Sequence, residues 1–133
     1  MTNAGMELLW SLRKALLDDA ALETIIKGRV YDIPLYDSIH PYISIDELTS
    51  RDISGTVAIV EEHLFRLKAY SRNGGKAEAL KIIHMACDGL SSKIALLNYR
   101  LVLFCVEYVE AKVHRDCMTA EATAQIKILT EII

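Results

Sequence analysis

The stretch Glu61–Gly75 constrains the fold more than any other part of this sequence. From His63 onward the side chains alternate between two sets, one with His63, Phe65, Leu67 and Ala69, the other with Leu64, Arg66, Lys68 and Tyr70. An antiparallel strand with one buried and one solvated face gives this alternation. Two glycines follow and allow positive φ without steric cost. We therefore expect an extended segment over Thr56–Ala69 that ends in a turn over residues 71–75.

Three segments show the three- and four-residue spacing of apolar side chains that indicates amphipathic helices. They are Met6–Leu17, Ala20–Lys27 and Lys76–Leu90. Asp18 and Asp19 separate the first two helices, and a carboxylate at this position can accept hydrogen bonds from the free N–H groups of the second helix.

Further strands are predicted on both sides of these elements. Tyr42–Ile45 and Ala122–Ile132 alternate between apolar and polar side chains, which indicates half-buried strands. Arg100–Glu110 is almost continuously apolar, which indicates a central strand covered on both faces and paired antiparallel with the last strand. Arg29–Ile33 is expected to be a short extended segment, and Ile94–Leu97 is a candidate for a short strand.

The connections between these elements have their own signals. Pro34 and Pro41 each disfavour helix at the preceding residue, so Pro34–His40 is expected to be a loop. Asp46–Gly55 is rich in charged and turn-forming residues, and we expect a long mobile loop there. Ala111–Thr119 is expected to be a polar connection.

Together these elements predict one α+β domain over residues 1–133. It has an N-terminal helical segment and a mostly antiparallel sheet of about four strands with helices on one face. A net charge of −3 argues against non-specific nucleic-acid binding, which needs a concentrated basic surface, although it leaves room for a local basic patch. Specific nucleic-acid binding is not expected either. The longest apolar run, Leu101–Val106, is far too short to span a bilayer. We therefore expect a soluble, cytoplasmic protein without a membrane partner.

The sequence contains none of the motifs that mark nucleotide, phosphate, serine-hydrolase or zinc-protease sites. No cofactor, metal or catalytic residue is therefore predicted. The three cysteines are an odd number without a CxxC pair, which favours a reducing compartment. An alternative from another class of protein stays open at this point, namely a small thiol-dependent enzyme in which His114 activates Cys117.

A modest cluster of cations lies on the polar side of the strand that ends in the glycine turn. Arg66 and Lys68 share this side with Tyr70, and Arg72 lies just beyond. A solvated sheet face explains these residues. An electrostatic contact with a partner subunit explains them as well, because tyrosine and arginine are enriched at interfaces.

Six blocks of this sequence occur in an order and spacing that resemble a known family. They are Leu16–Leu22, Gly28–Asp32 with Pro34 close behind, Pro41–Ile45, Tyr70–Arg72, Gly74–Ala79 and Tyr99–Val102. Over nearly the whole chain they resemble the small tail completion proteins, also called tail terminators, of long-tailed bacteriophages, prophages and gene transfer agents. Each block is short and mostly structural, so the resemblance rests on their order and on the matching chain length.

The resemblance implies an α+β subunit of a ring, usually a hexamer, without catalytic activity. Such a ring caps the tail tube at its head-proximal end, stops tube polymerisation and offers a docking surface to the head connector, while DNA passes through it. The protein would be cytoplasmic before assembly and part of the virion tail afterwards. The expected interface residues are Arg66, Lys68, Tyr70 and Arg72 on the strand, and Asp46, Arg51 and Asp52 in the expected loop. A head-completion or neck protein of the same particle is the alternative within this class.

The sequence departs from the family between its last two strands. Members often have an acidic, glycine-containing turn there, whereas Arg115–Thr119 keeps Arg-Asp and lacks the glycine. The geometry of the final hairpin is therefore open from the sequence.

Overall fold

The computed structural model describes residues 2–34 and 36–133. Met1, and Leu35 in the loop expected over Pro34–His40, lie outside the described residues. The described elements, in chain order, are α1 (Ala4–Leu17), α2 (Ala20–Ile26), β1 (Val30–Tyr31), β2 (Tyr42–Asp52), β3 (Val60–Ser71), α3 (Ala77–Lys93), β4 (Tyr99–Val113) and β5 (Ala120–Ile132). The three predicted helices are confirmed, and α3 continues beyond its predicted end to Lys93.

The five strands form one mixed sheet in the order β1-β2-β3-β5-β4. β1 runs parallel to β2, with Val30 opposite Ile43, whereas the other neighbouring pairs are antiparallel. The expectation of a mostly antiparallel sheet of about four strands is corrected accordingly. β2 thus runs in the same direction as β1, and residues 32–41 connect the two strands.

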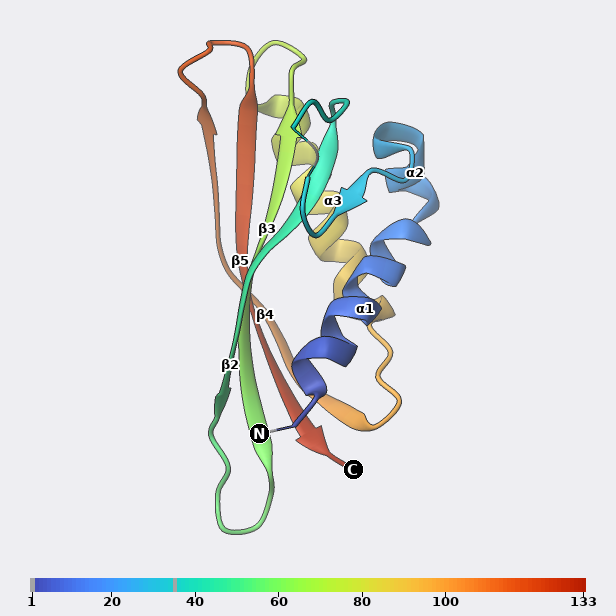
Figure 1. The fold of residues 1–133 in the computed structure, drawn as a ribbon, viewed down its shortest axis with the longest axis vertical. Helices are drawn as coiled ribbons and strands as arrows, with labels where there is room; N and C mark the ends of the chain where they lie inside the picture. Colours follow the sequence, from blue (N-terminus) through green and yellow to red (C-terminus); the bar gives the residue numbers. More distant parts are fainter. Residues whose placement is uncertain (1, 35) are drawn as a thin grey trace.

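The three helices lie against one face of the sheet (Figure 1). The apolar stripes of α1 and α3 pack there on alternate side chains of the inner strands, as ridged helices and pleated strands do when they share a core. The largest fully buried side chains are Phe65, Leu8, Leu12, Leu16, Leu22, Ile26, Ile43, Leu67, Ile82, Ile83, Leu90 and Ile126. We call the opposite face of the sheet, which carries none of the described helices, the open face.

The junction between α1 and α2 follows the sequence closely. Asp19 caps α2, because its Oδ1 accepts hydrogen bonds from the backbone N–H groups of Ala21 (3.0 Å) and Leu22 (3.2 Å). α2 ends in a left-handed turn in which Lys27 has φ 51° and Gly28 has φ 77°. This turn directs the chain into β1.

The prediction of a long mobile loop over Asp46–Gly55 is wrong. β2 continues through most of it to Asp52, and only residues 53–59 connect β2 to β3. A β-bulge between Asp46 and Thr49 places Glu47 at φ 46° and interrupts the alternation of side chains. This part of β2 lies at a sheet edge and buries little, so its polar composition resembles that of a loop.

The predicted central position of Arg100–Glu110 is also wrong. This segment belongs to β4 at the edge of the sheet, and β5 lies in the interior between β3 and β4. Two β-bulges insert Val102 and Glu107 as extra residues in β4. Each bulge shifts the side chains to the other face, so a partly exposed strand acquires an apolar run that resembles a covered one. Residues 94–97, a candidate strand, form no regular element, and β4 continues into the expected polar connection as far as Val113.

Candidate assembly surfaces

Four of the residues predicted for an interface lie together on the open face. Arg66 forms an ion pair with Glu47 (Nη1 to Oε2, 3.1 Å), and Lys68 forms one with Asp46 (Nζ to Oδ2, 3.5 Å). Tyr70 follows on the same side of β3. These cations are therefore balanced by carboxylates of the neighbouring strand, and the open face is a mixed-charge surface.

Two further residues predicted for an interface, Arg51 and Asp52, lie at the far end of β2 and not in the loop expected there. Arg51 forms an ion pair with Glu62 of β3 (Nη2 to Oε1, 2.9 Å), and its side chain stays largely exposed. The Asp52 carboxylate accepts a hydrogen bond from the backbone N–H of Ser54 (2.8 Å), which begins the turn to β3. The structure thus separates this pair from the four residues on the open face, and their role in an interface stays a prediction.

The open face also contains a buried carboxylate that was not predicted from the sequence. Glu121 of β5 is buried and lies 3.5 Å from Lys112 and 3.3 Å from the Nε2 atom of His114. Burial acts to raise the pKa of Glu121, but the positive charge of Lys68 and hydrogen bonds from His114 and Tyr70 hold it below its usual value. The alternation of β5 places Glu121 on this face, but its partners Lys68 and Tyr70 belong to β3, which is distant in the sequence.

The final hairpin forms without a glycine. Cys117 adopts the left-handed conformation, with φ 59°. The Asp116 carboxylate accepts hydrogen bonds from the backbone N–H groups of Thr119 and Met118, each at 2.8 Å, and these bonds hold its pKa well below the usual range. Arg72 donates a hydrogen bond from Nε to the Thr119 hydroxyl (3.0 Å). This bond joins the turn that follows β3 to the turn between β4 and β5. The aspartate therefore organises the turn in place of the glycine.

The thiol pair considered as a catalytic alternative is not assembled. The Cys117 thiol contacts the carbonyl of Arg115 at 3.7 Å, whereas the His114 ring is directed to Glu121. Cys87, in α3, is buried, and its burial raises the pKa of the thiol to about 11, the opposite of the shift that a reactive cysteine needs.

Replacing Cys117 with glycine is expected to raise the free energy of unfolding by up to about 1 kcal/mol. Glycine adopts φ 59° without steric strain. The backbone strain that is relieved exceeds the free-energy cost of the greater conformational entropy of glycine in the unfolded chain. Urea denaturation measures the change. Met118→Gly is the matched control in the same turn and should lower stability, because Met118 has no positive φ to relieve. A loss of stability in Cys117→Gly would contradict this account of the turn.

A polar cluster is buried on the helix side of the sheet, near the beginning of the chain. The His63 ring is fully buried, with the Ser50 hydroxyl 2.7 Å from Nδ1 and the Thr130 hydroxyl 2.8 Å from Nε2. Glu61 is also buried, its Oε2 lies 3.9 Å from His63 Nε2, and its Oε1 accepts a hydrogen bond from the backbone N–H of Thr2 (2.7 Å). Desolvation lowers the pKa of His63. The cluster joins the start of the chain to three strands.

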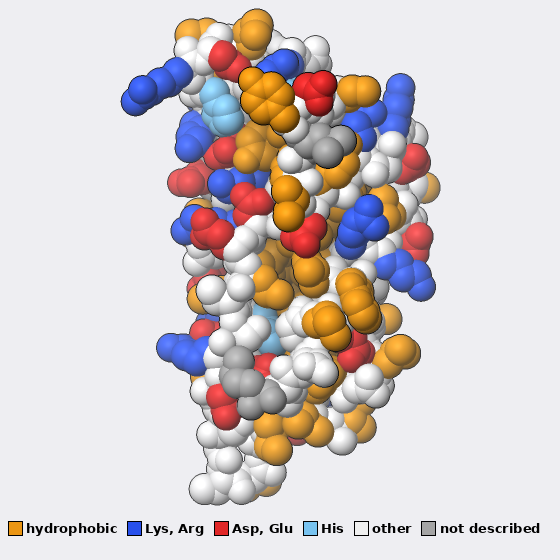
Figure 2. Space-filling model, viewed as in Figure 1, with side chains coloured by type: hydrophobic (Ala, Val, Ile, Leu, Met, Phe, Trp, Pro, Cys, Tyr) orange, Lys and Arg blue, Asp and Glu red, His pale blue; other side chains and the backbone are white. Residues whose placement is uncertain are grey.

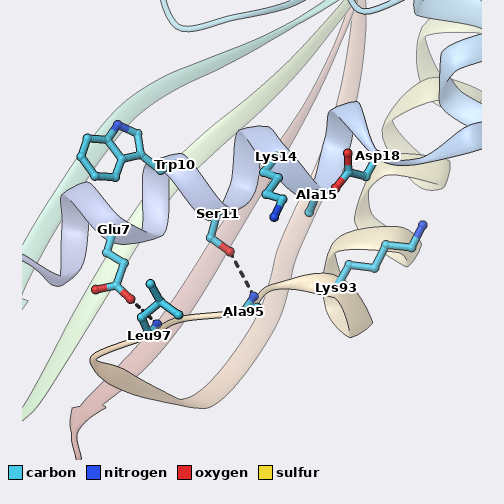
Figure 3. A pocket seen from close by; sticks show the side chains of 9 residues that line it. All are labelled: Glu7, Trp10, Ser11, Lys14, Ala15, Asp18, Lys93, Ala95 and Leu97. Carbon is cyan, nitrogen blue, oxygen red and sulfur yellow. Dashed lines mark hydrogen bonds between the residues drawn. The ribbon is translucent and has the colours of Figure 1, made fainter.

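A groove lined by both charged and apolar side chains lies between α1 and the segment that follows α3 (Figure 3). Ser11 accepts a hydrogen bond from the backbone N–H of Ala95 (3.0 Å), and Glu7 accepts one from that of Leu97, so the segment is fastened to the helix. Trp10 projects from the same helix and is 65% exposed. Figure 2 shows hydrophobic side chains gathered over the region of α1. Exposed tryptophan is typical of protein interfaces, and the leucine pattern of this helix did not reveal it.

In residues 2–34 and 36–133, no helix is both long and apolar enough to cross a membrane.

The fold resembles those of several solved structures, among them the following two. One comes from the virion of a native gene transfer agent particle; it is 20% identical, has a TM-score of 0.82 and covers 93% of this chain and 94% of its own. The other is the bacteriophage SPP1 gp17 protein, which is 16% identical, has a TM-score of 0.60 and covers 99% of this chain and 92% of its own. At these identities the two likenesses show the fold alone. No curated protein matches the sequence.

The sequence itself matches a family over residues 11–131, which is almost the entire chain. With this match, the fold and the exposed surfaces define a structural protein of virion tail assembly, found in phages and phage-like particles. The chain belongs to the family described as Tail completion protein gp17. The family predicted from the order of the sequence blocks is thereby confirmed.

Proposed function

We propose that this protein is a tail terminator whose copies close into a ring, expected to be a hexamer, on the head-proximal end of the tail tube. The ring stops polymerisation of the tube protein and then offers its other face to the head connector. The family match over residues 11–131 carries this proposal. Before assembly the protein is expected in the cytoplasm, and DNA passes through the finished ring.

The surfaces of the subunit support such a role. In a ring, each subunit contacts its two neighbours through two different surfaces. Repetition of this head-to-tail contact closes the ring when the rotation between neighbouring subunits is a whole-number fraction of a full turn. The sheet has two edges on opposite sides of the molecule, β1-β2 and β4. The exposed Trp10 groove and the mixed-charge open face are further surfaces of different chemistry for partners outside the ring.

Addition of the protein to growing tail tubes tests the proposal. Purified tube protein of the same particle is polymerised with and without this chain, and electron microscopy gives the distribution of tube lengths. We expect growth to stop early, with the protein on one end of each tube. If tube lengths are unchanged and the protein is needed only to join finished heads and tails, the neck-protein alternative replaces the terminator.

Reversal of the charges of Arg66 and Lys68 is expected to leave the subunit folded and to weaken assembly. Both residues contact carboxylates on the open face, and Lys68 also balances the buried Glu121. The double variant Arg66→Glu, Lys68→Glu should therefore stay folded but lose more than the ~1 kcal/mol that a surface ion pair contributes. Circular dichroism monitors folding, and termination of tube growth monitors assembly.

Compensating changes separate the two effects. Asp46→Lys with Glu47→Lys restores the ion pairs within the subunit but leaves the surface pattern reversed, so stability should recover while assembly stays impaired. Lys27→Glu with Lys81→Glu reverses two exposed charges, at the end of α2 and on α3, and is the matched control. Normal assembly of the first double variant would show that the two residues belong only to a solvated surface.

A further inference from the structure

β4 presents a long apolar edge. It pairs with β5 on one side, and its other side has no strand partner in the described part of the chain. Three large side chains along it are exposed: Val102 at 49%, Leu103 at 39% and Tyr108 at 40%. An exposed apolar edge strand of this length is a template for pairing with another chain. This edge therefore needs a partner strand in the assembled state.

The opposite edge of the sheet is only half covered. β1 pairs with Ile43 and Ser44 of β2, so the outer side of Asp46–Asp52 has no partner among the described strands. The connection that follows carries exposed aliphatic side chains, with Val57 at 96% and Ile59 at 53%. Both free edges thus adjoin apolar surface.

The two free stretches lie at the same level of the sheet. The strand registers form rows that cross all four long strands. One row contains Asp46, Arg66, Gln125 and Tyr108, the next contains Thr49, Leu64, Lys127 and Cys105, and the last contains Asp52, Glu61, Thr130 and Leu101. Asp46–Asp52 is therefore level with Leu101–Tyr108. In the lower half of Figure 1 these parts of β2 and β4 lie on opposite sides of the sheet.

The chain directions also match. Each step from β2 to β3, β5 and β4 is antiparallel, so β2 and β4 run in opposite directions. Two copies placed side by side in the same orientation therefore bring β4 of one next to β2 of the other as an antiparallel pair. One contact of this kind covers both free edges, whereas a two-fold contact of β4 with a second β4 leaves Asp46–Asp52 uncovered.

We propose that Leu101–Tyr108 of β4 pairs antiparallel with Asp46–Asp52 of β2 from a second copy of this chain, so that one sheet continues through neighbouring subunits. This inference rests on the proposed function, since it assigns the subunit contact of the ring. The rows of the sheet continue across the contact. Cys105 of one subunit then lies beside Thr49 of its neighbour, both on the open face.

Disulfide crosslinking tests the register directly. The native Cys105 supplies one thiol, and Thr49→Cys supplies the other in a Cys117→Ser background that removes the exposed thiol. After mild oxidation with diamide, non-reducing gels should show a ladder of dimers, trimers and larger species that ends at the closed ring. Thr24→Cys, an exposed threonine on α2, is the matched control and should give no ladder.

A second pair of variants tests the apolar edge without a covalent bond. Leu103→Lys should weaken self-association at least about tenfold, as loss of a central interface residue does, when the native mass is measured by light scattering across concentrations. Val113→Lys is the control, because Val113 is 48% exposed on the same strand but lies beyond the level of the free β2 stretch. Circular dichroism should show both variants folded.

Three outcomes overturn the inference. They are a Thr49→Cys protein that forms no ladder, crosslinked dimers that appear through Cys105 without Thr49→Cys, and equal self-association of the two lysine variants. If wild-type protein still stops tube growth in any of these cases, the terminator function stands and only the edge pairing is wrong. If wild-type protein neither self-associates nor stops tube growth, the proposed function fails and the edge pairing fails with it.

Discussion

Phe65→Ala is expected to lower the free energy of unfolding by about 3–5 kcal/mol, which is a large part of the roughly 5–15 kcal/mol that stabilises a domain of this size. Phe65 is 1% exposed and projects from β3 toward the helices, where it is among the largest fully buried side chains. Its truncation leaves a cavity that the packed helices cannot fill completely. Urea denaturation, followed by far-UV circular dichroism, measures the loss.

The neighbouring residue provides the control. Leu64 lies on the open face and is only partly buried, so Leu64→Ala should cost about 1 kcal/mol or less. The ratio of the two losses reports which face of β3 is covered. Similar losses, or a larger loss for Leu64, would mean that the register of β3 is displaced by one residue, since such a displacement exchanges the two faces.

Acid is expected to destabilise the folded protein through His63. The pKa of this buried ring is lowered in the folded state by desolvation, against an opposing effect of Glu61 beside it. The unfolded chain therefore binds the proton more readily. The contribution of neutral His63 is fully present above the usual histidine pKa of about 6.5, and it is lost as the pH falls toward the folded-state pKa. One proton changes the free energy of unfolding by at most about 1.4 kcal/mol per pH unit.

Two variants make this prediction specific. His63→Gln keeps hydrogen-bonding capacity toward Ser50 and Thr130 but cannot titrate, so it should flatten the dependence of stability on pH below 6.5. His84→Gln changes an exposed histidine on α3 and should leave that dependence unchanged. The midpoints of urea denaturation, measured for both variants between about pH 7.5 and 5, give the dependence of stability on pH. An unchanged pH dependence in His63→Gln would show that other groups control acid stability.

The elements with strong periodicity could be predicted from the sequence. The alternation after His63 predicted β3, and the apolar stripe that includes Ile83 predicted α3. Both elements bury one continuous face, over at least three turns in the helix and over several alternating residue pairs in the strand. The family followed from the order of short blocks. β1 could not be predicted as a paired strand, because a two-residue strand has no period and its parallel partner lies beyond a proline-bracketed connection.

The misplaced elements share a physical cause. Bulges at Glu47 in β2 and at Val102 and Glu107 in β4 break the two-residue period on which strand prediction depends. They made a polar edge strand resemble a loop and an apolar edge strand resemble an interior one.

The surfaces were predicted less well than the fold. Arg66 and Lys68, which are predicted interface residues, lie on the face where the alternation placed them, but their carboxylate partners come from a segment expected to be a loop. The partners of His63 are distant in sequence, and Ser50 lies in that same segment. Trp10 is apolar and lies on a helix, so only the structure shows that it faces outward.

Localisation of the protein on intact particles tests the central claim most directly. A small epitope tag inserted between Gly74 and Gly75, in the exposed turn that follows β3, and labelled with gold-conjugated antibody reports the position of the protein by electron microscopy. The account predicts label at one level only, where the tail tube meets the head, and overlong tubes without heads when the protein is absent. Label along the tube or at its distal tip, with tubes of normal length in the absence of the protein, would contradict the account.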